Sequence, residues 1–280
     1  VTLDLYVQPV ADPVTVTNVT TREDTGVLFL QGVALTDTDG SEKLTGITVN
    51  ALPANWVIRD NAGTIVFTGD GATAYTVPES AVANGDFLSY TLTPPAHSSA
   101  DISLSLSLTS IDTKTVNGVS LTDTLTSTVN QTVTVTPVAE KVATDTDGDS
   151  IPDLTINPSH VYSALGGEDL WFSLKQSGEG FDPKTGWSNE DADEKTYALL
   201  TPILSGGSAI GSQFSYTDGS GTHVLTYTGT ALRIPMTALD TVQFKAAANV
   251  SGTFEIQVQA LTIDTDPDTG ATVQAISGLS

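Results

Sequence analysis

Strict alternation of apolar and polar residues is the feature that most limits what this chain can fold into. The stretch 102–108 alternates without a break, and 254–259 alternates as cleanly. Side chains two residues apart lie on the same face of a strand, so this pattern predicts strands with one buried face. Helical periodicity is nearly absent, and turn residues such as Asp39-Gly40 and Asn117-Gly118 recur at intervals of about ten residues. The sequence therefore predicts an all-β sandwich.

The second half of the sequence repeats the order of features in the first half. An acidic loop leads into Glu42-Lys43, and a second acidic loop leads into Glu194-Lys195. Further along, Ile111-Asp112-Thr113 recurs as Ile263-Asp264-Thr265 after an alternating stretch. Two copies of one fold in tandem explain this order better than chance does.

The boundary between the copies is marked by a repeated segment. Pro9-Val10-Ala11-Asp12 near the start recurs as Pro137-Val138-Ala139-Glu140. Proline limits bending, so we interpret the segment as an interdomain linker that ends in a carboxylate. With 280 residues available, which is about twice the common domain size of roughly 150, the prediction is one domain over 1–137 and a second over 138–280.

Charge and composition exclude several function classes. Asp and Glu total 33 against 10 Lys and Arg, a net charge of −23, which argues against nucleic acid or direct membrane insertion and favours a cation as partner. Cysteine is absent, so disulfide scaffolds, thiolate metal sites and cysteine nucleophiles are excluded. The start Val1-Thr2-Leu3-Asp4 has neither a Met nor a basic leader, and we expect a soluble, monomeric piece of a longer protein.

The densest acidic motif spans 145–153 and has the spacing of a calcium loop. Carboxylates at its first, third, fifth and ninth positions, with a backbone carbonyl from the seventh, supply the oxygen ligands that Ca²⁺ requires. Glycine is missing from position six, and Ile156 replaces the final Glu of an EF-hand, so no helix-loop-helix is implied. The alternative is a solvated acidic turn. The predicted ligands are Asp145, Asp147, Asp149, Ile151 and Asp153.

A second acidic motif, Asp37-x-Asp39-Gly-Ser-Glu42, places alternating carboxylates on one tight turn. Such carboxylates repel one another unless a cation lies between them. Its expected partners fall at predicted strand ends, and the second domain contains a similar motif; the alternative is an ordinary acidic loop. The expected partners are Asp24, Asp101 and Asp112. The second motif is Asp191-x-Asp193-Glu194, with Asp169 and Asp264 as its partners, and the metal ligands expected from it are Asp169, Asp191, Asp193 and Asp264.

Five motifs in fixed order resemble the immunoglobulin-like or cadherin-like tandem repeats of giant type-I-secreted RTX adhesins of Gram-negative bacteria. The order runs Pro-Val-Ala-Asp, Glu-Asp-Thr, Asp-Thr-Asp-Gly-Ser-Glu, Ser-Ala-Asp-Ile and Ile-Asp-Thr across residues 1–140. The resemblance implies an extracellular chain of calcium-stabilised β-sandwiches that adjoin neighbouring repeats at the bacterial cell surface. It also implies that the calcium ligands include Asp12, Asp24, Asp37, Asp39, Glu42, Asp101 and Asp112.

The second domain departs from the pattern by a glycine-rich insertion over 175–189. Phe181 and Trp187 are costly to expose there, and aromatic residues in loops often supply binding area. We therefore name them as candidates for binding a cell-surface glycan or peptide; the alternative is that Trp187 folds back onto its own domain. Trp56 and Trp171 are expected in the core.

The sequence shows little sign of a catalytic motif. His97, His160 and His223 are isolated, no Gly-x-Ser-x-Gly elbow occurs, and Gly69-Asp70-Gly71 is interpreted as a hairpin turn. We therefore expect no enzyme but a calcium-dependent segment of a bacterial surface adhesin that acts in cell adhesion. In this interpretation the first domain is a rigid extender, and the second is either another spacer or the module that carries ligand recognition. The alternative is a fragment of an extracellular polysaccharide-acting enzyme with structural calcium.

Overall fold

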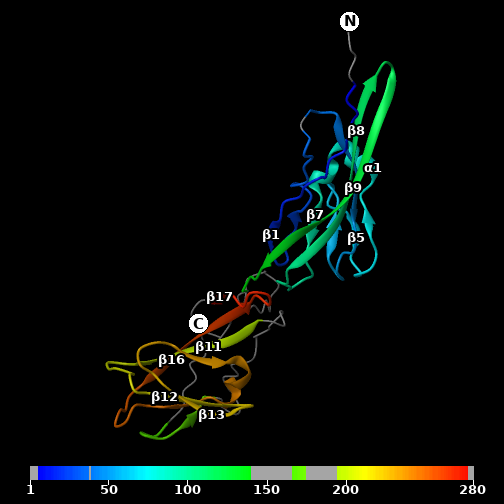
Figure 1. Cartoon of the computed structure of the whole chain (residues 1–280). Coiled ribbons are helices and arrows are strands. Elements are labelled where there is room, and N and C mark those ends of the chain that lie inside the picture. Colours follow the sequence, from blue (N-terminus) through cyan, green and yellow to red (C-terminus); the bar gives the residue numbers. More distant parts are fainter. Residues whose placement is uncertain (1–5, 38, 140–165, 175–193, 277–280) are drawn as a thin grey trace. The chain divides into compact units, whose positions relative to one another are not determined.

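The computed structural model describes residues 6–37, 39–139, 166–174 and 194–276. These residues form mostly antiparallel β-structure, which confirms the all-β prediction. The chain divides into two compact units (Figure 1): unit 1 is Val1–Pro137 with Asp266–Gly270, and unit 2 is Val138–Thr265 with Ala271–Ser280.

Unit 1 contains two sheets, with strand orders β1-β9-β8-β3-β6 and β2-β7-β4-β5. Strand β1 pairs with β9 in parallel, and the other pairs are antiparallel. A short helix and a 3₁₀ turn connect the sheets. The elements are β1 (Val19–Arg22), β2 (Val27–Leu28), β3 (Glu42–Val49), β4 (Val57–Arg59), β5 (Ile65–Thr68), β6 (Tyr75–Thr76), α1 (Glu79–Asn84), η1 (Asp86–Ser89), β7 (Thr91–Thr93), β8 (Ile102–Val116) and β9 (Val119–Thr136).

One hydrophobic core lies between the two sheets of unit 1. Leu104, Leu106 and Leu108 alternate along β8 and are fully buried, as the sequence pattern predicts. They share a cluster with Ile58 of β4 and Leu92 of β7 from the opposite sheet. Two sheets with a common core make unit 1 a β-sandwich in architecture. Trp56 is 3% exposed, which confirms its predicted place in this core.

Strands β8 and β9 form a long hairpin, drawn in green in Figure 1. Asn117 and Gly118 connect them with φ angles of 51° and 78°, and a two-residue loop with two positive φ angles suits the twist of a hairpin. Such a loop fixes the register of the whole ribbon, from Val116↔Val119 to Ile102↔Val133. Every residue of β8 therefore has a defined partner on β9.

The segment around Gly69 differs from the prediction of a hairpin turn. Strand β5 before it pairs with β4, whereas β6 after it pairs with β3, so the segment crosses between the sheets. Its backbone packs against the turn at 52–56: Gly69 N–H donates to the Trp56 carbonyl at 2.7 Å. A Cβ on Gly69 would lie 2.1 Å from the Pro53 carbonyl oxygen. Close backbone packing, which glycine alone permits, is the reason for glycine here.

Unit 2 contains two four-stranded sheets, with orders β10-β15-β12-β13 and β14-β11-β16-β17. All of its strand pairs are antiparallel. Its elements are β10 (Phe172–Ser173), β11 (Lys195–Leu204), β12 (Gln213–Asp218), β13 (Gly221–Thr226), β14 (Leu232–Pro235), η2 (Met236–Thr241), β15 (Gln243–Lys245), β16 (Phe254–Thr265) and β17 (Thr272–Ile276).

The core of unit 2 is built around aromatic rings. Phe244 lies at its centre, with ring centroids 5.0 Å from Phe214, 5.1 Å from Phe254 and 5.4 Å from Phe172. Trp171 is not part of this core: it is 36% exposed, because β10 begins at Phe172 and the alternation turns Phe172 inward instead. The prediction that Trp171 is a core residue is therefore wrong.

The two units share their strand arrangement. The order β9-β8-β3-β6 in unit 1 corresponds to β17-β16-β11-β14 in unit 2, and β2-β7-β4-β5 corresponds to β10-β15-β12-β13. Register agrees as well, because Lys43 pairs with Ile111 and Lys195 pairs with Ile263. The repeated sequence features thus occupy equivalent positions in two copies of one architecture.

Candidate metal centre

Three carboxylates of unit 1 lie close enough together to hold one cation. Asp12, Asp37 and Glu42 each offer a carboxylate oxygen, and these oxygens lie within 4.8 Å of one another. Glu42 is 5% exposed, whereas Asp12 is exposed and Asp37 is half-buried. Asp37 and Glu42 belong to one acidic motif, whereas Asp12 comes from the segment that enters unit 1, so the fold brings Asp12 to the other two.

Strand register places two more carboxylates beside this cluster. Glu42 begins β3 and lies opposite Asp112 of β8, and Asp112 in turn lies opposite Asp123 of β9. Three acids therefore form a row across three adjacent strands. Direct neighbours across a sheet have Cβ atoms about 5 Å apart, and like charges placed so closely destabilise the sheet unless they have partners.

The segment that enters unit 1 supplies part of that partnership through its backbone. The N–H groups of three successive residues each donate to one acid of the row: Val10 to Asp112 Oδ2 at 3.0 Å, Ala11 to Asp123 Oδ2 at 2.9 Å, and Asp12 to Glu42 Oε1 at 2.6 Å. Ser110 Oγ donates to the Asp12 carbonyl at 2.8 Å. The repeated Pro-Val-Ala-Asp motif is thus fastened to the sheet edge by hydrogen bonds to carboxylates.

Two buried oxygens of this row of acids lack a hydrogen-bond donor in the part of the chain that the structure describes. Among the described residues, neither Glu42 Oε2 nor Asp112 Oδ1 has a hydrogen-bond partner, although Glu42 and Asp112 are each 5% exposed. An uncompensated buried charge costs several kcal/mol, and native proteins pair such groups or use them to coordinate metals. These oxygens are the strongest indication that the cluster holds a cation.

The loop before β3 holds Asp37 next to the cluster. Asp37 Oδ1 accepts the Asp39 N–H at 3.0 Å, and Asp39 Oδ1 accepts the Ser41 N–H at 2.8 Å, which folds the acidic motif into two successive turns. The hydrogen bond from the Ser41 hydroxyl lowers the pKa of Asp39. Asp39 is exposed and serves the turn, so Asp37 and Glu42 are the members of this motif that join the cluster.

The donor set fits a hard cation. Every side chain offered by the cluster is a carboxylate, and the chain has no cysteine. Oxygen-only sites suit Ca²⁺, Mg²⁺ and Mn²⁺, and Ca²⁺ accepts the irregular arrangements that loops provide. Asp12, Asp37 and Glu42 are the residues that would hold the ion, and Asp112 lies opposite Glu42 in the strand register.

Two predicted partners of the acidic loop lie elsewhere in unit 1. Asp101 precedes β8 and accepts the Val135 N–H at 2.8 Å. About 36 Å of extended strand separates it from Asp112. Asp24, in a left-handed turn with φ of 55°, accepts the His97 N–H at 3.0 Å. Asp24 and Asp101 therefore do not join Asp37 and Glu42: Asp101 lies at the opposite end of the strand from Asp112, and Asp24 lies in a turn that contacts His97.

Unit 2 has an equivalent pair of acids. Glu194 directly precedes β11 and is 7% exposed, and Asp264 on β16 is fully buried. The register that pairs Lys195 with Ile263 places them as Glu42 and Asp112 are placed in unit 1. Asp169, with φ of 62°, accepts the Asn249 N–H at 3.4 Å in a separate loop.

The remaining predicted site residues lie outside the described part of the chain. They are the calcium loop Asp145, Asp147, Asp149, Ile151 and Asp153, the acids Asp191 and Asp193, and the ligand candidates Phe181 and Trp187. Their predictions stay predictions.

Sequence reasoning missed Asp123 and did not name Glu194 as a ligand candidate. Asp123 could have been found from the Asn117-Gly118 turn, because a two-residue hairpin places 123 opposite 112. Glu194 stands in the repeated Glu-Lys step before a predicted strand, where Glu42 stands in the first copy. In both cases register was the available signal.

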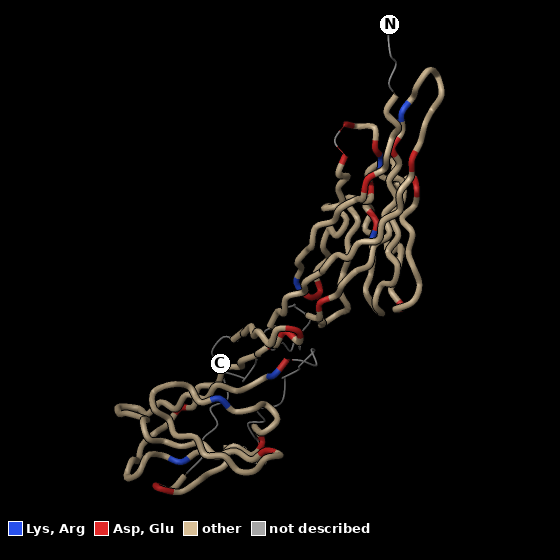
Figure 2. Tube along the Cα trace, viewed as in Figure 1, with Lys and Arg blue, Asp and Glu red and all other residues tan. Residues whose placement is uncertain are grey.

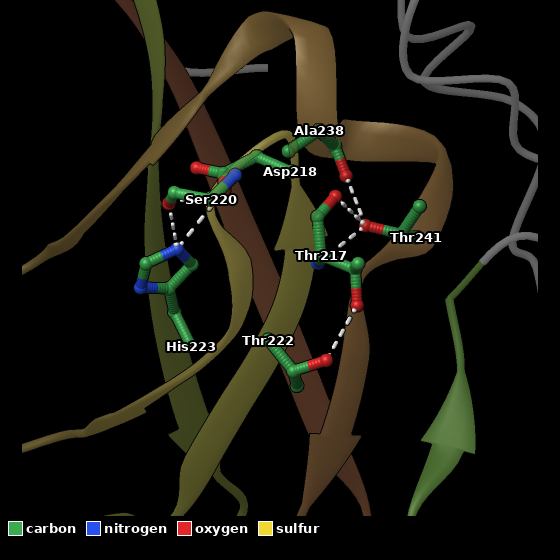
Figure 3. A network of polar contacts seen from close by, with 7 residues as sticks. All are labelled: Thr217, Asp218, Ser220, Thr222, His223, Ala238 and Thr241. Carbon is green, nitrogen blue, oxygen red and sulfur yellow. Dashed lines mark hydrogen bonds and ion pairs between the residues drawn. The ribbon is translucent and has the colours of Figure 1, made fainter.

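A second polar network, in unit 2, contains Ser, His and Asp side chains (Figure 3). Asp218 Oδ1 accepts the Ser220 hydroxyl at 2.7 Å, and this bond contributes most to holding the pKa of Asp218 at about 2. His223 Nε2 lies 3.0 Å from both Ser220 Oγ and Asp218 Oδ1. A nucleophile relay needs Ser and Asp on different ring nitrogens, so this geometry closes the β12–β13 turn instead.

Comparison with protein-family models, curated proteins and solved structures gave no match. In the described part of the chain, none of the helices has the length and apolar character needed to cross a membrane.

Proposed function

We propose that this chain is a calcium-dependent segment of a bacterial surface adhesin, in which tandem β-sandwich units act as a rigid extender and present a ligand-binding surface. The observation that carries the proposal is the pair of buried oxygens, Glu42 Oε2 and Asp112 Oδ1, which lack donors among the described residues next to the Asp12–Asp37–Glu42 cluster. Support also comes from the excess of acids in both units (Figure 2).

The position of the cluster supports a mechanical role. Val10, Ala11 and Asp12 belong to the repeated linker motif, and their N–H groups contact acids on β3, β8 and β9. A cation bound by Asp12 together with Asp37 and Glu42 would join this segment to the sheet through charge as well as hydrogen bonds. Without the cation the like charges favour separation of the segment from the sheet. Calcium would therefore stiffen the entry to unit 1, as an extender requires.

The expected energy is large relative to domain stability. A ligand that binds only the folded state at about 100 times its dissociation constant adds roughly 2.7 kcal/mol. A typical domain has only about 5–15 kcal/mol of total stability. One site therefore contributes a sizeable share, and a second site of the same kind in unit 2 would double it.

Thermal unfolding of the full chain in calcium and in EDTA tests the proposal. We expect the melting temperature to be markedly lower in EDTA and to be restored by added Ca²⁺. Mg²⁺ should restore the melting temperature less than Ca²⁺ does, because Mg²⁺ requires near-ideal octahedral geometry and the ligands here come from irregular segments. Equal melting curves in calcium and in chelator would refute the calcium dependence.

A further inference from the structure

The outer face of the sheet β10-β15-β12-β13 carries no acidic residue in the two rows that flank its inward-facing row. Inward-facing residues form one row across the four strands, Phe172, Phe244, Phe214 and Leu225, and all four belong to or pack against the core. Because side chains alternate along strands, the neighbouring residues on each strand point away from the core. Two outward rows result: Ser173, Gln243, Ser215 and Val224, and then Lys245, Gln213 and Thr226 with Trp171.

An exposed indole lies at one edge of this face. Trp171 is 36% exposed, and Lys245 Nζ lies 5.0 Å from the centroid of its ring. Large aromatic rings are expensive to leave in water, and exposed ones commonly mark a binding surface. The contact with Lys245 holds a positive charge beside the indole.

Apart from the exposed Val224, the remaining side chains of the two rows are neutral hydrogen-bonding groups, and one of them, Ser215, is only 6% exposed. Gln213 Nε2 donates to Thr226 Oγ1 at 3.2 Å, and Ser215 Oγ lies 3.5 Å from Gln243 Oε1. Each amide has two N–H donors and one carbonyl acceptor, so these single contacts, the ones found among the described residues, leave both amides able to bind hydroxyl groups of a ligand.

Charge decides which ligand suits the face. The two outward rows hold one charged residue, Lys245, and it is a cation in a chain with 33 acidic and 10 basic residues. An acidic protein repels a ligand that carries a carboxylate. On this face, however, the ligand meets the ammonium group of Lys245, and neither outward row contains an acid. A pyranose ring also offers C–H groups to the indole and hydroxyls to the amides.

We propose that this face binds an acidic saccharide of the uronate class, with its ring on Trp171, its carboxylate paired with Lys245, and its hydroxyls bonded to Gln213 and Gln243. The inference rests on the proposed adhesive function for its biological meaning and specifies the ligand class. It places recognition on a sheet face rather than on the 175–189 insertion.

Isothermal titration of the full chain with tetragalacturonate, in calcium throughout, tests the inference. We expect binding by the wild type, about tenfold weaker binding by Trp171→Ala and Lys245→Gln, and weaker binding of the methyl-esterified tetrasaccharide, since a charge-assisted hydrogen bond is worth about 1.5–3 kcal/mol. Lys195→Gln, an exposed cation on the other sheet of unit 2, is the matched control and should bind as the wild type does.

Three outcomes would overturn the inference: no binding of tetragalacturonate by the wild type, equal binding of the methyl ester, or equal weakening by Lys195→Gln. If Trp171→Ala also lowers the melting temperature, the conservative variants Trp171→Phe and Lys245→Arg are measured in addition. Both keep the ring or the charge and are expected to retain most of the binding. The melting curves in calcium and EDTA are recorded separately. Loss of saccharide binding with calcium-dependent melting intact therefore contradicts this inference alone.

Discussion

Substitution of Glu42 by Gln should change the stability of unit 1 in opposite directions with and without calcium. Gln retains the Oε1 acceptor that binds the Asp12 N–H at 2.6 Å. It replaces the buried Oε2, which has no donor among the described residues, by an amide that can donate to Asp12 or Asp37, whose carboxylates lie within 4.8 Å. The substitution therefore removes a charge with little change in shape.

The magnitudes follow from these distances. Two unit charges at that separation repel by roughly 1 kcal/mol at a dielectric constant of 80 and by about 3.5 kcal/mol at 20. In EDTA, Glu42→Gln should therefore raise the free energy of unfolding by about 1 kcal/mol or more. In saturating calcium it should lower the free energy of unfolding by roughly 1.7 kcal/mol, because the loss of one site's contribution of about 2.7 kcal/mol outweighs the relieved repulsion of about 1 kcal/mol. At about 4 °C per kcal/mol, the loss in calcium is near 7 °C.

Differential scanning calorimetry of wild type and variant in both buffers measures the effect. The matched control is Glu79→Gln, which also removes one acidic charge, but from an exposed position in the first turn of α1. It should have the same small effect in calcium and in EDTA. A Glu42→Gln effect of the same sign and size in both buffers would refute the assignment of Glu42 as a cation ligand.

Two further predictions concern the fold. Gly69→Ala should lower the free energy of unfolding, measured by urea titration, by about 1–3 kcal/mol, because the added Cβ would lie 2.1 Å from the Pro53 carbonyl oxygen. Gly219→Ala is the control and should change the free energy little, because its Cβ meets no atom within 4 Å; equal effects of the two substitutions would contradict the packing argument. Thr73→Val should raise the pKa of Asp70 from about 2 toward 3.8, because the Thr73 hydroxyl bond is the main cause of the low value, and an unchanged NMR titration would contradict this. Since the folded pKa is the lower one, the stabilisation from this bond is complete above the unfolded pKa of about 3.9 and is lost as the pH falls toward 2.

Local patterns predicted much of unit 1, because they depend on neighbouring residues alone. The alternation at 102–108 predicted the buried leucines of β8, and Asn117-Gly118 marked the turn that follows. The alternation could not predict that β8 continues to Val116, because exposed residues near the end of a hairpin carry no buried face. Alternation also says nothing about which strand ends meet, so it could not show that Asp24 and Asp101 do not join Asp37.

Positions that depend on contacts between sheets were beyond the sequence. Gly69 stands between glycine-rich turn residues, and only the packing of its backbone against Pro53 shows that the chain crosses between sheets there. Trp171 occupies an apolar stretch, Leu170-Trp171-Phe172, in which either aromatic residue could face the core. In the folded unit the ring of Phe172 contacts that of Phe244 at the centre of the core, so Phe172 is the one that faces inward. Alternation fixes which residues share a face, but not which face is buried.

Anomalous X-ray scattering from crystals grown with Tb³⁺, an oxygen-preferring ion with absorption edges suited to the method, tests the central claim most directly. The account predicts a strong anomalous peak between the carboxylates of Asp12, Asp37 and Glu42, and a loss of that peak in Glu42→Gln. The absence of an anomalous peak at this position, with terbium bound elsewhere in the same crystal, would contradict the account.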